Sequence, residues 1–284
     1  MAFNILANLR AGFRRAHPLR YFAAKVLVKT GLCVHIIIDR GYYKLRFFPS
    51  GVTGEMFIDG SSRLREDEQT LFTLLNKGDT YIDVGANVGS LLFTAKHIVG
   101  ATGVAIGVEP HPRIFGYLRS NAQLNNADVI LYNVAIGSKI GHLAFSDSIT
   151  DEMNAVQPEN AGGLSVEAQT LDSLLCGVEK IDLLKIDVEG YELEVLRGAS
   201  SVLDRTRMIY FESWIKHSES FGYTTADLIA SLQEKSFSVF KRERDGWSEI
   251  HTDYVSRNCE NLLAVRDLPL RNSSSIDQAS RSYS

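Results

Sequence analysis

The sequence predicts an α/β fold in which helices cover both faces of a largely parallel β-sheet. Two observations predict it: strand-like and helix-like segments alternate through the middle of the chain, and the strand-like runs are almost continuously apolar. Such alternation is typical of parallel strands joined by crossover helices, and strands with few polar positions are usually buried on both faces. The 284 residues, 45% hydrophobic and 23% charged, suit one large domain with appendages.

A basic extension, residues 1–65, precedes the alternating pattern. Residues 1–30 are predicted to be helical, and residues 34–48 to form a β-hairpin about the turn at 39–41. Residues 1–50 contain nine Lys or Arg against one acidic residue, although the whole chain has a net charge of −4. Two interpretations stay open: contact with an anionic membrane surface or acidic partner, and a helical arm packed on the acidic body, which we favour.

The alternating units follow a predicted helix over residues 66–76. The predicted strands are 81–85, 104–110, 129–137, 181–190 and 207–213. The predicted helices that separate or follow them are 88–99, 113–125, 192–199 and 225–235. The units from 66 to 268 are assigned to one domain.

Two segments depart from this pattern. Residues 138–180 are predicted to contain a short strand, a polar loop over 146–165 and a second strand. After the last helix, the chain is predicted to form antiparallel strands with a turn at Asp245-Gly246. The Ser-rich tail, residues 269–284, is predicted to be disordered.

The cysteines and the apolar segments of the sequence also indicate the cellular compartment to expect. Three widely spaced cysteines without a CxxC pair favour a reducing compartment, and no secretory leader is expected at the N-terminus. The apolar stretch 21–38 contains Lys25, Lys29 and His35, so it is predicted to be a helix followed by a strand and not a membrane span. A cytoplasmic location is expected, with peripheral membrane contact through the basic segment as the alternative.

A glycine-containing loop, DVGANVG, follows the first strand of the alternating region. No Gly-Lys-Ser/Thr follows it, so the loop is not a P-loop. Asn87 replaces the middle glycine that lets a dinucleotide pyrophosphate approach the backbone. With Asp83, Gly85 and Gly89 around it, Asn87 favours a ligand that has an amine and a carboxylate, such as S-adenosylmethionine (SAM).

Glu109 ends the second strand and is the next candidate for a ligand contact. A carboxylate there can accept hydrogen bonds from both hydroxyls of a ribose and disfavours a 2′-phosphate, and hence NADP. The loop and this acid together fit either SAM or NAD.

A second motif, LLKIDVEGYELEVLRGA over residues 183–199, bears on the choice between SAM and NAD. Together with DVGANVG, VEPHP, SNAQLNN, NVAIG and TLDSLL, it resembles the FkbM family of SAM-dependent methyltransferases over roughly residues 66–213. The resemblance implies a Rossmann-like class I methyltransferase fold, with a seven-stranded, mostly parallel sheet and an antiparallel last strand. It also implies methyl transfer from SAM to a hydroxyl of a sugar, a glycan or a secondary metabolite.

Methyl transfer requires alignment of the acceptor oxygen with the methyl group, and often removal of a proton from the acceptor. We therefore expect catalytic carboxylates near the ends of the fourth and fifth strands, namely Asp187, Glu189 and Glu212. For Asp187, a positioning role is favoured over that of a general base. The alternative for Glu189 is stabilisation of a helix N-terminus, and this alternative applies more strongly to Glu192 and Glu194. For Glu212, the alternative to a role in the cleft is a simple salt bridge.

Other candidates lie near the same edge of the predicted sheet. Asn133 and Ala135 end the third strand, where the adenine is expected. The loop over 146–165, with Asp151, Met153 and Asn154, is a candidate substrate lid. Lys185 lies in an apolar strand, either beside a site carboxylate or at a strand edge, and His111 and His217 are expected to be ordinary polar surface residues. Asp187, Glu189 and Glu212 would offer oxygen ligands to Mg²⁺, but no ligand spacing demands a metal and none is expected.

Three other functions were compared with methyl transfer to a hydroxyl. Asn87 argues against an NAD-dependent oxidoreductase. The intact set of Asp83, Gly85, Glu109 and Asp187 argues against a non-catalytic binding domain of methyltransferase-like fold. A nucleic-acid methyltransferase is disfavoured by the acidic body and by the absence of an Asn/Asp-Pro-Pro-Tyr/Phe motif. The expected partner is a small-molecule or glycan acceptor and no nucleic acid; the sequence predicts neither the identity of the acceptor nor the oligomeric state.

Overall fold

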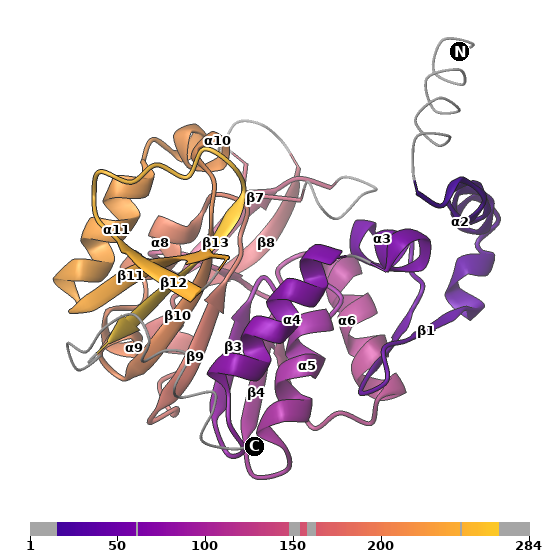
Figure 1. Cartoon of the computed structure of the whole chain (residues 1–284), viewed down its shortest axis with the longest axis horizontal. Helices are drawn as coiled ribbons and strands as arrows, with labels where there is room; N and C mark the ends of the chain where they lie inside the picture. The colour runs from indigo at the N-terminus through magenta and orange to yellow at the C-terminus, as the bar shows by residue number, and fades with distance from the viewer. Residues whose placement is uncertain (1–15, 61, 148–153, 158–162, 245, 267–284) are drawn as a thin grey trace.

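An eight-stranded sheet forms the centre of the computed structural model, which describes residues 16–60, 62–147, 154–157, 163–244 and 246–266 (Figure 1). Its strands lie in the order β12-β11-β13-β10-β9-β3-β4-β5. Their bounds are β3 (Thr80–Val84), β4 (Val104–Val108), β5 (Ile130–Tyr132), β9 (Ile181–Ile186), β10 (Thr206–Ser213), β11 (Phe237–Glu243), β12 (Gly246–Ile250) and β13 (Glu260–Arg266).

The strand directions confirm the predicted fold class. β10, β9, β3, β4 and β5 are parallel to their neighbours in this series, whereas the last strand, β13, is antiparallel to both β10 and β11. The sheet has one strand more than the seven predicted, because β12 folds back on β11 as a hairpin and extends the edge.

Helices cover both faces of this sheet, as the alternation predicted (Figure 1). On one face lie α4 (Ser62–Leu74), α5 (Ser90–Val99) and α6 (Pro112–Leu124). On the other face lie α8 (Glu192–Arg197), α9 (Ser200–Asp204) and α11 (Thr225–Glu234). Two short helices, α7 (Leu171–Leu174) and α10 (Ile215–Ser218), also belong to this part of the chain. Side chains of a strand point to alternate faces. Tyr81 accordingly belongs to one core cluster, with Leu71 and Leu91. Ile82 belongs to the other, with Leu193 and Leu228. All six residues of β9 are buried, which confirms burial on both faces.

The strand order reverses between β3 and β9. From β3 the chain adds β4 and then β5 on one side, and later adds β9 and β10 on the other. In open α/β sheets, the space beyond the carboxyl ends of the strands at such a reversal is where ligands bind. The residues after β3 and β9 therefore face the expected site.

The segment predicted as one strand over 129–137 is two strands, and that prediction was wrong. β5 ends at Tyr132, whereas β6 (Ala135–Ile136) pairs with β8 (Leu164–Gln169), which also pairs with β7 (Gly141–Phe145). Between β5 and β6, the side-chain amide of Asn133 donates to the carbonyl oxygens of Glu109 and Pro110, and the chain leaves the main sheet there. The small β6-β8-β7 sheet contains the strands predicted on either side of the 146–165 loop.

The N-terminal extension forms α2 (Pro18–Thr30), the hairpin β1 (Ile37–Asp39) and β2 (Lys44–Arg46), and α3 (Gly51–Asp59). The hairpin and the change from helix to strand within 21–38 were both predicted correctly. Within the described ranges, every helix is too short or too polar to cross a membrane. Residues 1–15 and the tail beyond 266 lie outside the described part, so membrane contact and a disordered tail stay predictions.

Candidate active site

A cleft opens beyond the carboxyl ends of β3, β4, β9 and β10. Eight of the ten predicted site residues line it: Asp83, Gly85, Asn87, Glu109, Ala135, Asp187, Glu189 and Glu212. Gly89 and Asn133 are not part of this lining. Segments separated by more than a hundred residues therefore meet where the sequence placed the site.

The turn after β3 is shaped by two glycines and one asparagine. Gly85 has a φ of 87°, and a Cβ built on it would lie 1.8 Å from the carbonyl oxygen of Asp187. Gly89 has a φ of 95°, and its Cβ would lie 2.5 Å from the ring of Phe93, so packing alone accounts for this glycine. Asn87 has a φ of 50°, and its buried Oδ1 accepts no hydrogen bond from the described part of the chain. A buried acceptor of this kind needs a partner, which a ligand can provide.

Glu109 is held rigidly by two backbone donors. The amide of Asn87 donates to Oε2 at 3.0 Å, and the amide of His111 donates to Oε1 at 2.9 Å. Each carboxylate oxygen has two lone pairs, so the carboxylate can also accept hydrogen bonds from a pair of ribose hydroxyls. The side-chain amide of Asn133 also donates to the backbone carbonyl of Glu109 and so helps to fix this strand end.

His111 is not the surface residue that the sequence predicted. Only 2% of it is exposed, and its Nδ1 accepts the amide hydrogen of Arg113 at the start of α6. Its Nε2 lies 3.1 Å from Asp147. His111 therefore caps a helix beside the site.

The buried ammonium of Lys185 is paired with two carboxylates. Its Nζ lies 2.9 Å from Oδ2 of Asp187 and 3.8 Å from Oδ1 of Asp83, with both Lys185 and Asp83 buried. Burial raises the pKa of Asp83 to about 6, an effect that Lys185 opposes and Asp187 reinforces. Burial alone would lower the pKa of Lys185, but the two carboxylates raise it above its usual range, so the ammonium stays charged. Of the two open explanations for Lys185, the structure supports pairing with site carboxylates.

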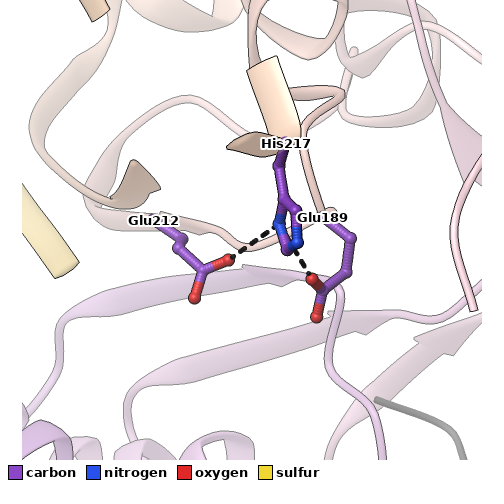
Figure 2. A group of neighbouring side chains, drawn as sticks. All are labelled: Glu189, Glu212 and His217. Carbon is purple, nitrogen blue, oxygen red and sulfur yellow. Dashed lines mark ion pairs between the residues drawn. The ribbon is translucent and has the colours of Figure 1, made fainter. Parts of the chain in front are cut away.

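A second cluster joins Glu189, Glu212 and His217 (Figure 2). Glu189 follows β9, Glu212 lies in β10, and His217 lies in α10. Nδ1 of His217 is 3.2 Å from Oε2 of Glu189 and 3.9 Å from Oε2 of Glu212. The thiol of Cys259 donates to Oε1 of Glu212 at 2.7 Å. Where the sequence predicted an ordinary surface histidine, the side chain of His217 is half-buried beside these two carboxylates, and its position four residues after β10 is the signal that the sequence offers.

The backbone around Glu189 is unusual. Glu189 has a φ of 56°, a left-handed conformation that costs energy for a residue with a side chain. Gly190 follows with a φ of 99°, and a Cβ there would lie 2.7 Å from the carbonyl oxygen of His217. The Glu-Gly pair of the second motif thus lets α10 approach the end of β9.

The pKa values of Glu189 and His217 are shifted in opposite directions. Burial raises the pKa of Glu189 to about 9, and the charges of Asp187, Glu212 and Glu192 add to the increase. Burial lowers the pKa of His217, although Asp187 opposes that shift. At neutral pH and without a further ligand, Glu189 is therefore protonated and His217 is neutral.

Glu192 has the structural role that the sequence favoured. Its Oε1 accepts the amides of Val188 and Gly190, and its Oε2 accepts the hydroxyl of Tyr223. Glu192 thereby fixes the turn that carries Glu189.

The candidate lid reaches the cleft in part. Asn154 and Val156 line it, together with Phe145 from β7. Asp151 and Met153, also assigned to the lid, lie outside the described residues.

The family model of the FkbM methyltransferase domain matches residues 83–239, from the glycine loop to β11. The chain belongs to the FkbM methyltransferase family. SAM is accordingly its methyl donor. The cleft of this FkbM methyltransferase fits SAM, because Asp83 offers a carboxylate for an amine, Asn87 an open acceptor, and Glu109 a fixed carboxylate for a ribose.

Three relatives are similar to this FkbM methyltransferase. The hexuronic acid methyltransferase AglP of Haloferax volcanii is 27% identical over 64% of this chain and 75% of its own. The 2-O-methyltransferase NoeI of Sinorhizobium fredii is 31% identical over 60% and 75%. The methyltransferase sdnD of Sordaria araneosa is 28% identical over 59% and 76%.

Proposed function

We propose that this FkbM methyltransferase transfers a methyl group to a hydroxyl oxygen of a sugar or glycan. The observation that carries the proposal is the proximity of Asp187, Glu189 and Glu212 to the glycine loop in one cleft. The names of two relatives, a hexuronic acid methyltransferase and a 2-O-methyltransferase, support a sugar hydroxyl as the acceptor.

We assign the donor to the β3–β4 side of the cleft. Asp83 and Asn87 bind the amino-acid end of SAM, Glu109 binds the ribose, and Ala135 lies against the adenine. The buried, unsatisfied oxygen of Asn87 and the fixed carboxylate of Glu109 support this orientation. Gly85 keeps the loop close to β9, so the donor and Asp187 share one space.

SAM supplies a methyl group bound to a positively charged sulfur. As the bond from the methyl carbon to the acceptor oxygen forms, the bond to sulfur breaks, the hydroxyl proton passes to the protein and S-adenosylhomocysteine is released. We assign Asp187 as the group that accepts the proton of the acceptor hydroxyl. Lys185 holds Oδ2 of Asp187, which leaves Oδ1 to accept a hydrogen bond from the hydroxyl. That bond both positions the hydroxyl and gives its proton a destination.

The first test measures binding of SAM and S-adenosylhomocysteine by calorimetry, with NAD as the control ligand. We expect SAM to bind the wild type and not NAD. In Glu109→Ala, we expect at least about tenfold weaker binding, because a hydrogen bond to a charged group contributes about 1.5–3 kcal/mol. Glu219→Gln, which changes an exposed carboxylate outside the cleft, is the matched control.

The second test measures release of S-adenosylhomocysteine with uronic-acid and neutral oligosaccharides as acceptors. Turnover that Asp187→Asn abolishes, with SAM binding retained, supports the proposal. A wild type that binds SAM and methylates none of these acceptors contradicts the sugar assignment, and a wild type that binds NAD and not SAM contradicts the donor assignment.

A further inference from the structure

The cluster of Glu189, Glu212 and His217 has the geometry of a metal site. One donor atom from each residue lies within 4.8 Å of the other two, and the closest pairs are 3.2 Å and 3.9 Å apart. Metal–ligand bonds of about 2.0–2.2 Å place two donors on the same ion roughly 3–4 Å apart. The three side chains come from separate segments and converge on one point (Figure 2), so small rotations suffice to share an ion.

The donor types agree with this geometry. Two carboxylates and one imidazole suit divalent ions such as Mn²⁺, Zn²⁺ or Mg²⁺. Three protein ligands also leave coordination positions open for a substrate oxygen, as in catalytic metal sites.

The charges around the cluster favour a cation. The cleft is lined by the carboxylates of Asp83, Glu109, Asp187, Glu189 and Glu212. Lys185, the lysine that lines it, is engaged by Asp187 and Asp83 on the donor side. A divalent cation would supply the positive charge that allows several acidic side chains in a partly buried space to be ionised together.

The strained backbone at Glu189 is an independent observation. A non-glycine residue at a φ of 56° is held there by its surroundings, and such strain is concentrated where geometry serves function. Here, Glu192 accepts the amides on either side of Glu189, at Val188 and Gly190. In this conformation, the Glu189 carboxylate lies 3.2 Å from Nδ1 of His217.

We propose that Glu189, Glu212 and His217 bind a divalent cation that holds the acceptor hydroxyl beside Asp187. This inference rests on the proposed function for its role, though not for the existence of the site. A bound cation lowers the pKa of a hydroxyl that contacts it. The proton then passes to Asp187, the electron pair stays on the acceptor oxygen, and that oxygen forms the bond to the methyl carbon as the carbon–sulfur bond breaks. A second sugar oxygen can occupy a further open position, which would favour acceptors with neighbouring oxygen atoms.

The site is tested first by titrating the protein with Mn²⁺ in the absence of SAM, following free Mn²⁺ by electron paramagnetic resonance. We expect one Mn²⁺ per chain in the wild type. In His217→Ala and Glu189→Gln, we expect at least about tenfold weaker binding, since even the loss of a residue that orients a ligand costs 10–100-fold in affinity. His142→Ala and Glu219→Gln, which change exposed residues that are not part of the cluster, are the matched controls and should bind like the wild type.

Thermal unfolding and SAM binding of every variant separate loss of the site from loss of the fold. A wild type that binds SAM but no Mn²⁺ overturns the metal site and leaves the proposed function intact; the cluster is then an acid–base group that shares a proton. Mn²⁺ binding that is unchanged in both His217→Ala and Glu189→Gln places the ion elsewhere and also overturns it. A wild type that binds Mn²⁺ but not SAM instead contradicts the proposed function.

The role of the ion is tested by methyl transfer after chelation. We expect chelated enzyme to lose turnover while retaining SAM affinity, and added Mn²⁺ to restore turnover in the wild type and in Glu219→Gln. Turnover that is equal in chelated and Mn²⁺-loaded enzyme overturns the assignment of the ion to the acceptor.

Discussion

At the scale of single residues, Asp83 should make SAM binding depend on pH. Its pKa is raised to about 6 by burial and by Asp187, against Lys185 and a smaller effect of Tyr81. If Asp83 binds the amine of SAM, only its ionised form does so. As the pH falls through about 6, the carboxylate becomes protonated, and we expect affinity to fall by up to about tenfold per pH unit. Calorimetric titrations between about pH 5 and pH 8 measure this slope.

The variant Asp83→Asn identifies the group. It removes the charge with little change in shape, so SAM should bind weakly at every pH and with a nearly flat profile. A slope in Asp83→Asn equal to that of the wild type would assign the pH dependence to another group.

Single residues also show what a sequence can predict about a site. Asp83, Glu109 and Asp187 were predicted because each lies at or near the carboxyl end of a strand in a recognisable motif, and strand ends converge in this fold. The contact between His217 and Glu189 was not predictable, because Glu189 lies 28 residues earlier and has an unusual backbone conformation. The environment of Lys185 likewise depends on Asp83 across the sheet, which no local pattern reports.

At the scale of elements, the turn after β3 should tolerate no side chain at Gly85. Alanine there would require a φ of 87°, which costs roughly 1–3 kcal/mol, and its Cβ would meet the carbonyl oxygen of Asp187 at 1.8 Å. We expect Gly85→Ala to lower the free energy of unfolding by more than the backbone cost alone and to abolish SAM binding. Urea denaturation and calorimetry measure the two effects.

Gly116 provides the matched substitution. It lies inside α6, and within the described chain a Cβ built on it has no contact closer than 4 Å. Gly116→Ala should therefore stabilise the protein by up to about 1 kcal/mol through helix propensity. If both variants lost the same stability, the geometry of the β3 turn would not be the cause.

The elements themselves were largely predictable from periodicity, with one instructive exception. β3, β4, β9 and β10 are apolar runs that end at polar site residues, and their pattern is local. The division of 129–137 into two strands does not follow from a local pattern, because β6 forms by pairing with β8, where Ala135 lies opposite Ala168. A strand that changes sheets keeps its apolar pattern, so the sequence alone could not place its end.

At the scale of the whole molecule, the N-terminal extension is joined to the methyltransferase body by polar contacts as well as apolar ones. Asn121 and Asn125 of the α6 region accept the backbone amides of Arg46 and Lys44 through their side-chain oxygens. Val52 of α3 lines the cleft. The extension therefore contributes to the site, although its composition alone indicated only a basic arm.

A buried ion pair also links the extension to the body, and it yields a prediction about how the extension is held. Arg40 donates to Glu68 of α4 at 2.6 Å, and Tyr43 donates to the other oxygen of Glu68 at 2.6 Å; the side chains of Arg40 and Glu68 are 11% and 6% exposed. Arg40→Ala leaves this carboxylate buried without its cation, a change that typically costs about 3–5 kcal/mol. In Arg40→Ala with Glu68→Gln, no charge is buried and Tyr43 keeps an acceptor, so we expect recovery of most of that loss in urea denaturation. A loss below about 1 kcal/mol in the single variant, the value of an exposed pair, would mean that the extension separates readily from the body and that Val52 does not stay in the cleft.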